Sequence, residues 1–303
     1  MGRASITRGA DTEPVASPPS PGAVLSAHSD GGVAVDVCPA NHRHVPQQRE
    51  CSERRFPRVY RLASYAEKSE AIATEVLFDL QQRSGSVAIH HAVIGARDPE
   101  RAFWLAESVL TAGLGMGRRL GFSSGNMSDG AIGAPAVSLG VDAVSDITLD
   151  GILRAAGIPI RPVVSGLLAL EDHRPYRFTT LVDPSAITLD PMVVFIKGRM
   201  TRVSDAAARG AGVIGAEVRE IPAVALARAK MILTALVGKG IVSLLAIGAP
   251  GRPVVDVPIS AGMAGILVPS GLNPVAAMVE HGACDPLRFD IALSEWRELS
   301  LVF

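Results

Sequence analysis

Cysteine and net charge are scarce in this sequence of 303 residues, and each shortage excludes a class of protein. Three unevenly spaced cysteines are too few for a disulfide framework, which favours a reducing compartment, and we expect the cytoplasm. A formal net charge of -1 excludes a chain-wide basic surface for nucleic acid. The sequence has no run of about 18 apolar residues, so we expect no membrane-spanning helix and no membrane partner.

The sequence also lacks the motifs that indicate common catalytic sites. It contains no Gly-x-x-x-x-Gly-Lys-Ser/Thr phosphate loop, no His-Glu-x-x-His zinc helix and no Gly-x-Ser-x-Gly elbow. The stretch Gly113-Leu-Gly-Met-Gly117 resembles part of a dinucleotide loop, but it follows a predicted helix and precedes a predicted strand, which is the wrong order. We therefore predict no catalytic residue and no cofactor, and nothing in the sequence requires an enzyme.

Residues 1–57 differ in composition from the rest of the chain. They are rich in Pro, Ser and Gly and show no helical or strand period, so we predict a flexible arm. Four residues of this arm, Cys38, His42, His44 and Cys51, are of the types that bind zinc. Their spacing matches no familiar zinc pattern, so we favour the flexible arm and predict no metal site.

Residues 58–303 form the predicted globular body. Aromatic residues make up only 4% of the chain, so its core must consist of Ala, Val, Leu and Ile, as in sheets covered by helices. A helix is predicted over most of residues 60–82. Two similar units follow, at about 84–157 and 211–283, separated by a connector at 158–210 that contains a hairpin and followed by a C-terminal segment at 284–303. Each unit has the order strand, helix, strand, apolar strand, capped turn, short helix.

These units predict an α/β fold built from internally duplicated strand–helix units with pseudo-twofold symmetry, in which helices cover mixed sheets. In the second unit, Asn273 suits a helix N-cap, Pro274 the first turn and Gly282 the residue beyond the last turn. In the first unit, residues 147–151 are predicted to form the turn, with Leu149-Asp150 equivalent to Leu272-Asn273. Each helix start would present free backbone N–H groups, which suit a small anion.

Short sequence motifs in these segments resemble those of a known family. Ile147-Thr-Leu-Asp150, Thr188-Leu-Asp-Pro191, Arg219-Glu-Ile-Pro222 and the stretch from Gly271 to Ala277 are similar, in order and spacing, to the regulatory domain of the archaeal nitrogen repressor NrpR family. The resemblance covers roughly residues 58–303. It implies a homodimeric α/β effector domain that binds 2-oxoglutarate. The family's winged-helix DNA-binding domain has no counterpart in residues 1–57, so we expect a protein partner to supply any DNA binding.

A ligand site for 2-oxoglutarate or a similar dicarboxylate is predicted at the capped turns. An arginine from positions 161, 177, 199 or 202 would supply positive charge, because carboxylates favour guanidinium partners. The Asp150 carboxylate would repel an anion, so Ser270-Gly271 is the better half of the site. The predicted ligand-binding residues are Thr148, Asp150, Gly151, Thr188, Arg199, Ser270, Gly271 and Asn273.

Two other functions remain open from the sequence. One is an enzyme that acts on a small carboxylic acid, with Asp150, Asp190 or a histidine of the pair His90-His91 as general base. The other is a structural module whose duplicated body and apolar C-terminus serve only oligomerisation. Turnover in a metabolite screen would favour the enzyme, and assembly without a ligand would favour the structural module.

Overall fold

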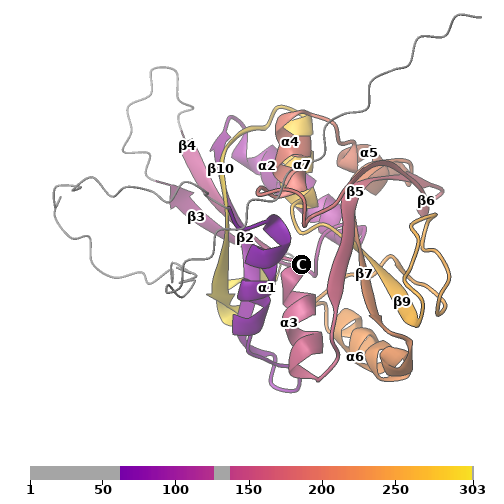
Figure 1. The fold of residues 1–303 in the computed structure, drawn as a ribbon. Helices are drawn as coiled ribbons and strands as arrows, with labels where there is room; N and C mark the ends of the chain where they lie inside the picture. The colour runs from indigo at the N-terminus through magenta and orange to yellow at the C-terminus, as the bar shows by residue number, and fades with distance from the viewer. Residues whose placement is uncertain (1–61, 126–136, 302–303) are drawn as a thin grey trace, which may run out of the picture. The chain divides into compact units, whose positions relative to one another are not determined.

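The computed structural model describes residues 62–125 and 137–301, which form two sheets and the helices around them (Figure 1). The predicted arm of residues 1–57, with its four zinc-type side chains, lies outside the described residues. No helix in the described part of the chain is both long and apolar enough to cross a bilayer.

The first sheet has six strands in the order β1-β2-β4-β3-β11, with β10 paired to β2. β10 pairs with residues 86–96 of β2, and β1 pairs with residues 84–85. The strand bounds are β1 Phe78–Asp79, β2 Ser84–Ala96, β3 Arg119–Gly125, β4 Val137–Val144, β10 Cys284–Glu295 and β11 Ser300–Leu301.

The second sheet has five strands in the order β6-β5-β7-β9-β8. β5 and β6 form the hairpin predicted for the connector, and its turn holds Asp172 and His173 at positive φ. The strand bounds are β5 Arg161–Glu171, β6 Arg174–Val182, β7 Gly212–Pro222, β8 Ala246–Ile247 and β9 Met263–Pro269. From its apolar residues we expected the second strand of the second unit to span 241–247, and β8 covers only the last two of these residues.

Every pairing between described strands is antiparallel, whereas we expected mixed sheets. The reason is the placement of β4 and β9. A helix connects β2 to β3, but β4 returns between them and pairs antiparallel with both. In the second half β9 lies in the same way between β7 and β8. The α/β class is confirmed, and the sheet type is corrected.

The two halves have the same order of elements and exchange one strand each. In the first half α3 leads into β5, which joins the second sheet beside β7. In the second half α7 leads into β10, which joins the first sheet beside β2. Both sheets therefore contain strands from both halves, so the halves are held together by backbone hydrogen bonds. This repeated topology is what an internal duplication would produce, and the duplication itself stays a prediction.

Seven α-helices are described, and several begin where the sequence predicts. α2 begins at Pro99 after Asp98, whose carboxylate accepts from the Arg101 amide, and α4 begins at Pro191 after the capping residue Asp190. The helix predicted within 60–82 is shorter than expected, because a capping box of Ser64 and Glu67 starts it. The bounds are α1 Tyr65–Glu75, α2 Pro99–Thr111, α3 Ile147–Ala155, α4 Pro191–Lys197, α5 Val203–Arg209, α6 Leu226–Gly238 and α7 Asn273–Glu280, with 3-10 turns at Ala223–Ala225 and Trp296–Glu298.

The two helix starts near the middle of the molecule differ from the sequence prediction. α3 begins at Ile147, so the stretch predicted as a turn is its first helical turn, and Asp150 is not a cap. Asn273 is the first residue of α7 and does not cap it. In both halves a serine hydroxyl before the helix accepts a hydrogen bond from the backbone N–H two residues later. Ile147 N donates to Ser145 Oγ and Leu272 N donates to Ser270 Oγ, each at 3.2 Å. The equivalent positions are thus Ser145 and Ser270, two residues away from the predicted alignment.

Glu280, the last residue of α7, holds the start of α5. Its carboxylate accepts hydrogen bonds from the backbone N–H of Val203 at 2.6 Å and of Ser204 at 3.0 Å. We predict that Glu280→Ala lowers the free energy of unfolding by about 1–2 kcal/mol, because two helix-start donors lose their acceptor. Urea unfolding measures this. Glu75→Ala, at the exposed last residue of α1, is the matched control and should change stability by less than about 0.5 kcal/mol. Equal losses would contradict the capping role.

Candidate functional site

A buried arginine surrounded by acids lies where the two halves meet. Arg219, on β7, is 1% exposed. Its Nε donates to Asp150 Oδ1 at 2.6 Å, its Nη1 donates to Glu217 Oε2 at 2.9 Å, and its Nη2 donates to Asp146 Oδ2. Asp146 and Asp150 belong to the start of α3 in the first half, whereas Arg219 and Glu217 belong to the second. One guanidinium therefore joins the halves through charged hydrogen bonds.

The same cluster extends through a serine to a buried histidine. Ser145 Oγ lies 3.4 Å from Asp146 Oδ1 and 3.5 Å from His90 Nε2. His90 Nε2 also lies 3.3 Å from Asp190 Oδ2, at the start of α4. We call the seven residues Arg219, Glu217, Asp146, Asp150, Ser145, His90 and Asp190 the buried network. His91, which follows His90 in sequence, contacts Asp142 at 2.5 Å. Adjacent strand residues face opposite sides of a sheet, so the two histidines point to opposite faces of β2.

Carboxyl groups outnumber bases in the buried network. Burial affects the pKa values of three of them, Glu217, Asp150 and Asp146. Burial, followed by the negative charge of Asp146, raises the pKa of Glu217 well above its usual value. Burial also raises the pKa of Asp150, against the opposing charge of Arg219. For Asp146 the burial effect is outweighed by Arg219, and its pKa is lowered. Burial lowers the pKa of His90, but its hydrogen bond to Asp190 and the negative charges of Asp190 and Asp146 together raise it above the usual value. The folded protein therefore retains the proton of Glu217 to higher pH than the unfolded chain does.

This proton gives the fold a pH dependence that can be measured. Because the pKa of Glu217 is higher in the folded than in the unfolded chain, its stabilising contribution is complete below the unfolded pKa and is lost as pH rises through the folded pKa. We predict that stability falls with rising pH above the ordinary carboxyl range, by at most about 1.4 kcal/mol per pH unit for this proton. Glu217→Gln keeps a neutral hydrogen-bonding group and should reduce that slope. Urea unfolding from about pH 5 to pH 9 tests it. An unchanged slope in the variant would contradict a protonated Glu217.

The two predicted helix starts are in direct contact, so no space is left between them. A β-carbon on Gly271 would lie 2.2 Å from the carbonyl oxygen of Val144 and 3.0 Å from His90 Nδ1. Their amide groups are engaged within the chain: Thr148 N donates to Ser145 O, and Asn273 N to Ser270 O. Of the amides expected to be free, those of Thr148, Ser270 and Asn273 therefore have acceptors within the chain. The physical reason is that each start is closed by its own serine turn and by the other start.

The side chains of three predicted ligand-binding residues form hydrogen bonds within the chain. Thr148 Oγ1 donates to the Ala88 carbonyl at 2.8 Å. The Asn273 side chain donates to the carbonyls of Leu114 and Gly215, at 2.7 and 2.8 Å, and accepts from the Gly215 amide at 2.8 Å. Ser270 is 1% exposed and accepts the Leu272 amide. Each side chain therefore has a hydrogen-bond partner within the chain and is engaged without a ligand.

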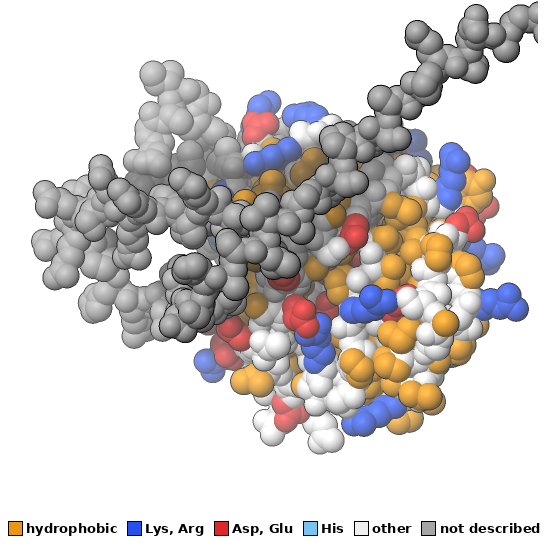
Figure 2. Space-filling model, in the orientation of Figure 1, with side chains coloured by type: hydrophobic (Ala, Val, Ile, Leu, Met, Phe, Trp, Pro, Cys, Tyr) orange, Lys and Arg blue, Asp and Glu red, His pale blue; other side chains and the backbone are white. Residues whose placement is uncertain are grey.

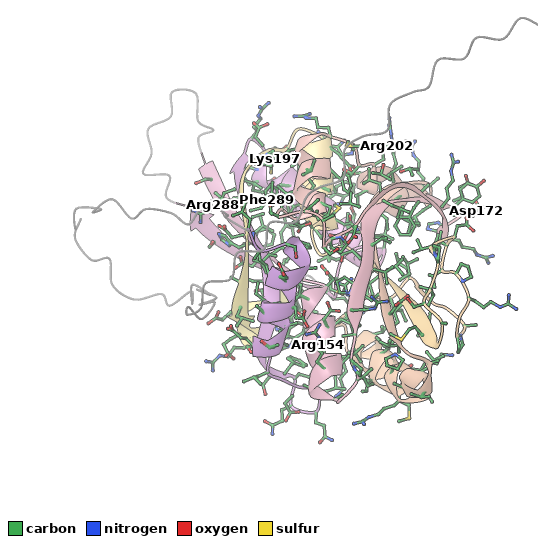
Figure 3. The ribbon with its side chains drawn as sticks, viewed as in Figure 1. Arg154, Asp172, Lys197, Arg202, Arg288 and Phe289 are labelled. Atoms are coloured by element: carbon green, nitrogen blue, oxygen red, sulfur yellow. The ribbon has the colours of Figure 1, made fainter. Side chains whose placement is uncertain are left out.

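The remaining predicted residues are dispersed. Gly151 packs against α1, where a β-carbon would lie 2.5 Å from Val76 Cβ. The Thr188 carbonyl accepts from the Lys68 ammonium at 2.9 Å. Arg199 is exposed beyond the end of α4, between Lys197 and Arg202 in sequence, and these two lie at the opposite end of the molecule from Arg154 in Figure 3. Of the eight predicted residues, Asp150 lines the pocket described next.

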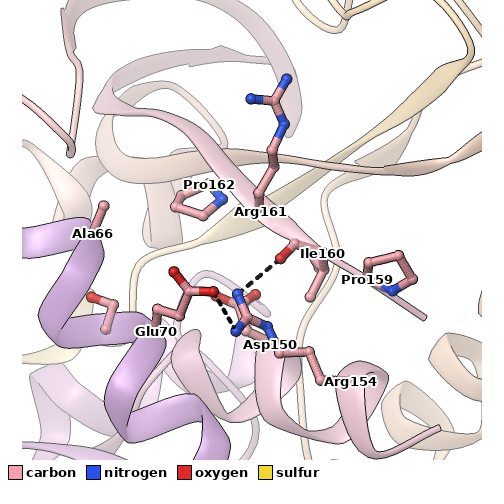
Figure 4. A pocket seen from close by; sticks show the side chains of 9 residues that line it. Ala66, Glu70, Asp150, Arg154, Pro159, Ile160, Arg161 and Pro162 are labelled. Carbon is pink, nitrogen blue, oxygen red and sulfur yellow. Dashed lines mark hydrogen bonds and ion pairs between the residues drawn. The ribbon is translucent and has the colours of Figure 1, made fainter. Parts of the chain in front are cut away.

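That pocket, with a volume of about 410 Å³, lies between α1, α3 and the start of β5 (Figure 4). We call it the α1–α3–β5 pocket. Its lining residues are Ala66, Ser69, Glu70, Asp150, Arg154, Pro159, Ile160, Arg161 and Pro162. Asp150 is its link to the buried network. Among the described residues, no group of three or more His, Cys, Asp or Glu side chains has the arrangement of a metal site.

Two arginines of the pocket already hold carboxylates. Arg154 donates to Glu70 at 3.0 Å and to the Ile160 carbonyl at 3.1 Å. Arg161 donates to Glu220 at 2.7 Å, and Figure 4 shows its guanidinium directed away from Arg154. The Glu70 side chain is 64% exposed, so its ion pair with Arg154 is a weak surface pair. Arg154 is thus the guanidinium that an incoming carboxylate could engage at least cost.

Sequence reasoning missed Arg219, Glu217 and Arg154 as site residues. Glu217 and Arg219 alternate with apolar residues in β7, a pattern that also describes an ordinary solvent-facing side. The signal that could have found Arg219 is the family resemblance itself. The words quoted for it include Arg219, Asp150 and Asp190, which all belong to the buried network.

Comparisons with known proteins agree with this structure. The global nitrogen regulator NrpRI of Methanosarcina mazei is 30% identical over 148 residues, which cover 49% of this chain and 46% of the relative. The global nitrogen regulator NrpR of Methanocaldococcus jannaschii is 26% identical over 202 residues, covering 67% of this chain and 34% of the relative. The chain therefore spans less than half the length of these curated relatives.

A solved structure shows the same fold. The crystal structure of a nitrogen repressor-like protein from Methanococcus jannaschii superposes with a TM-score of 0.68 and 21% identity, covering 80% of this chain and all of that one. The family model described as NrpR regulatory domains NRD1 and 2 matches residues 62–299, which include both sheets and the buried network. This chain belongs to the family of NrpR regulatory domains.

Proposed function

We propose that this chain is a regulatory domain that senses a small dicarboxylate in the α1–α3–β5 pocket, and that 2-oxoglutarate, the ligand implied by the family resemblance, is the effector. The observation that supports the proposal is the Arg154 guanidinium, which lines the pocket and is held there by an exposed acid. A volume of about 410 Å³ is within the usual range for small-molecule sites.

Exchange of carboxylates at Arg154 is the proposed binding step. A ligand carboxylate takes the place of Glu70, and the Ile160 carbonyl keeps the guanidinium in position. Because exposed ion pairs contribute only about 0–1 kcal/mol, releasing Glu70 costs little. A second carboxylate would face Arg161 at the rim of the pocket, in exchange for its pair with Glu220. Arg161 was among the arginines considered from the sequence.

Calorimetric titration with 2-oxoglutarate tests the proposal. We predict that Arg154→Ala weakens binding by about 10- to 100-fold, because a charge-assisted hydrogen bond to the ligand is lost. Arg228→Ala removes the same charge from the exposed face of α6 and should leave the affinity unchanged. Thermal unfolding of both variants controls for folding. Equal affinity in wild type and Arg154→Ala would overturn this site.

A companion variant should bind more tightly. Glu70→Gln removes the competitor for Arg154 and one negative charge from the pocket, so the affinity for 2-oxoglutarate should rise several-fold. A side chain with only a structural role at this position would not produce a gain.

The proposed regulatory output depends on other molecules. The relatives are named global nitrogen regulators, and we propose that this domain acts as a homodimer with a protein partner that contacts DNA. On the visible part of the face in Figure 2, basic and acidic side chains are interspersed and form no continuous basic surface, which supports a partner for that task. Light scattering of the purified chain tests the dimer. Specific DNA binding by the chain alone would overturn the need for a partner.

A further inference from the structure

The charges around the α1–α3–β5 pocket are unfavourable for a dianion unless a proton enters with it. Asp150 lines the pocket and is only 4% exposed. Its Oδ1 accepts from Arg219, but Arg219 is shared with two further carboxyl groups. The positive charge of this one guanidinium is therefore shared among three carboxyl groups and is not available to Asp150 alone. A dicarboxylate held by Arg154, one helical turn further along α3, would bring two negative charges toward this buried carboxyl group.

Every element packed around Asp150 contributes charge, and acidic groups are as numerous as basic ones even before Asp150 itself is counted. The charged and titratable groups that surround it are Asp146 and Arg154 on α3, Glu217 and Arg219 on β7, Glu70 on α1, Arg161 on β5, His90 on β2 and Asp190 before α4. Arg154 and Arg161 are the cations that the ligand itself would use. Arg219 and His90 then remain to face four carboxyl groups of the buried network, so the network has no surplus positive charge to absorb a dianion.

Protonation of Asp150 relieves this conflict at small structural cost. Its pKa is already raised by burial, and the negative charge of a ligand close by would raise it further. A protonated Asp150 still offers an oxygen to Arg219 Nε, and Arg219 keeps Asp146 and Glu217 as partners. The proton comes from solvent, and the reaction is protein plus ligand dianion plus one proton, giving a complex with neutral Asp150.

We propose that binding of a dicarboxylate in the α1–α3–β5 pocket is accompanied by uptake of one proton at Asp150, so that the domain responds to both effector concentration and pH. This inference rests on the proposed function and adds to it the regulation of the site. The affinity for the dianion rises as pH falls, by about tenfold per pH unit where Asp150 is ionised in the free protein and protonated in the complex.

Calorimetry of the intact chain in buffers of different ionisation enthalpy measures this proton directly. With 2-oxoglutarate as the probe at neutral pH, the observed heat should vary with buffer ionisation enthalpy with a slope of about one proton taken up, and Kd should rise with pH. Asp150→Asn keeps an oxygen for Arg219, and it should abolish the uptake and flatten the pH dependence. Glu70→Gln, which changes an exposed acid of the same pocket, should retain the uptake.

The outcomes separate this inference from the function on which it rests. Binding with no proton uptake overturns the inference and leaves the proposed function standing. Uptake that persists in Asp150→Asn assigns the proton to another group and also overturns it. Absence of binding to the wild-type chain across the pH range overturns the proposed function and the inference with it. If Asp150→Asn does not fold, the slope of about one proton in wild type and in Glu70→Gln still decides the uptake.

Discussion

Replacing Arg219 by methionine should lower the free energy of unfolding by about 3–5 kcal/mol, which is a large fraction of the stability of a domain. The methionine fills much of the volume but leaves Asp146, Asp150 and Glu217 buried without their shared cation. Breaking a buried ion pair costs more than the pair contributes, because the remaining charges are neither solvated nor paired. Urea unfolding at neutral pH measures the loss.

A matched exposed pair provides the control. Arg288 Nε contacts Asp290 Oδ2 at 2.8 Å, with both side chains more than half exposed. Arg288→Met removes the same type of group and should cost less than about 1 kcal/mol. The Arg219 variant should also recover part of its stability at acidic pH, where Asp146 and Asp150 become neutral. Losses of similar size in both variants would show that Arg219 does not hold the acids as described.

Gly271→Ala should be nearly as damaging, although it adds a single methyl group. The new β-carbon would lie 2.2 Å from the Val144 carbonyl oxygen. This oxygen belongs to the backbone, and the next amide, Ser145 N, is fixed to the Ala88 carbonyl at 2.8 Å, so no side-chain rotation relieves the clash. The two helix starts must move apart, and we expect a loss of about 2–4 kcal/mol, which thermal or urea unfolding will show.

Gly238→Ala is the control for this substitution. Gly238 ends α6, and no atom lies within 4 Å of a β-carbon built there. Alanine at this position should be neutral or stabilise the protein by about 0.5–1 kcal/mol, because it restricts the unfolded chain. A Gly271→Ala protein as stable as wild type would mean that the two helix starts do not touch as closely as the structure places them.

Local signals in the sequence predicted local structure well. Asp98 before Pro99 and Asp190 before Pro191 both mark helix starts, and Gly210 and Gly282 both adopt the positive φ expected after a helix. These predictions succeed because a cap or a glycine acts within a few residues of its position. The boundaries of α3 were wrong because Ser145, not Asp150, receives the first amide, and either residue type suits that task.

The candidate site was less predictable than the fold. Asp150 was identified from its place near a helix start, but its partner Arg219 lies 69 residues away in sequence. The sequence contains no signal for which cation meets which carboxylate over such a distance. The predicted meeting of the two helix starts is confirmed by the contact between Gly271 and Val144, whereas several of the amides expected to be free there are used inside the chain.

The amino-acid sequence by itself determined the class of the fold, the positions of most strands and helices and the family, because apolar periodicity, caps and short words are local properties. The tertiary structure alone decided that β5 and β10 change sheets, that the strands it describes all pair antiparallel, and that acids from one half enclose an arginine from the other. The physical reason is that pairing energies depend on which surfaces meet in space, and burial turns ordinary charged residues into a coupled network only after they have met.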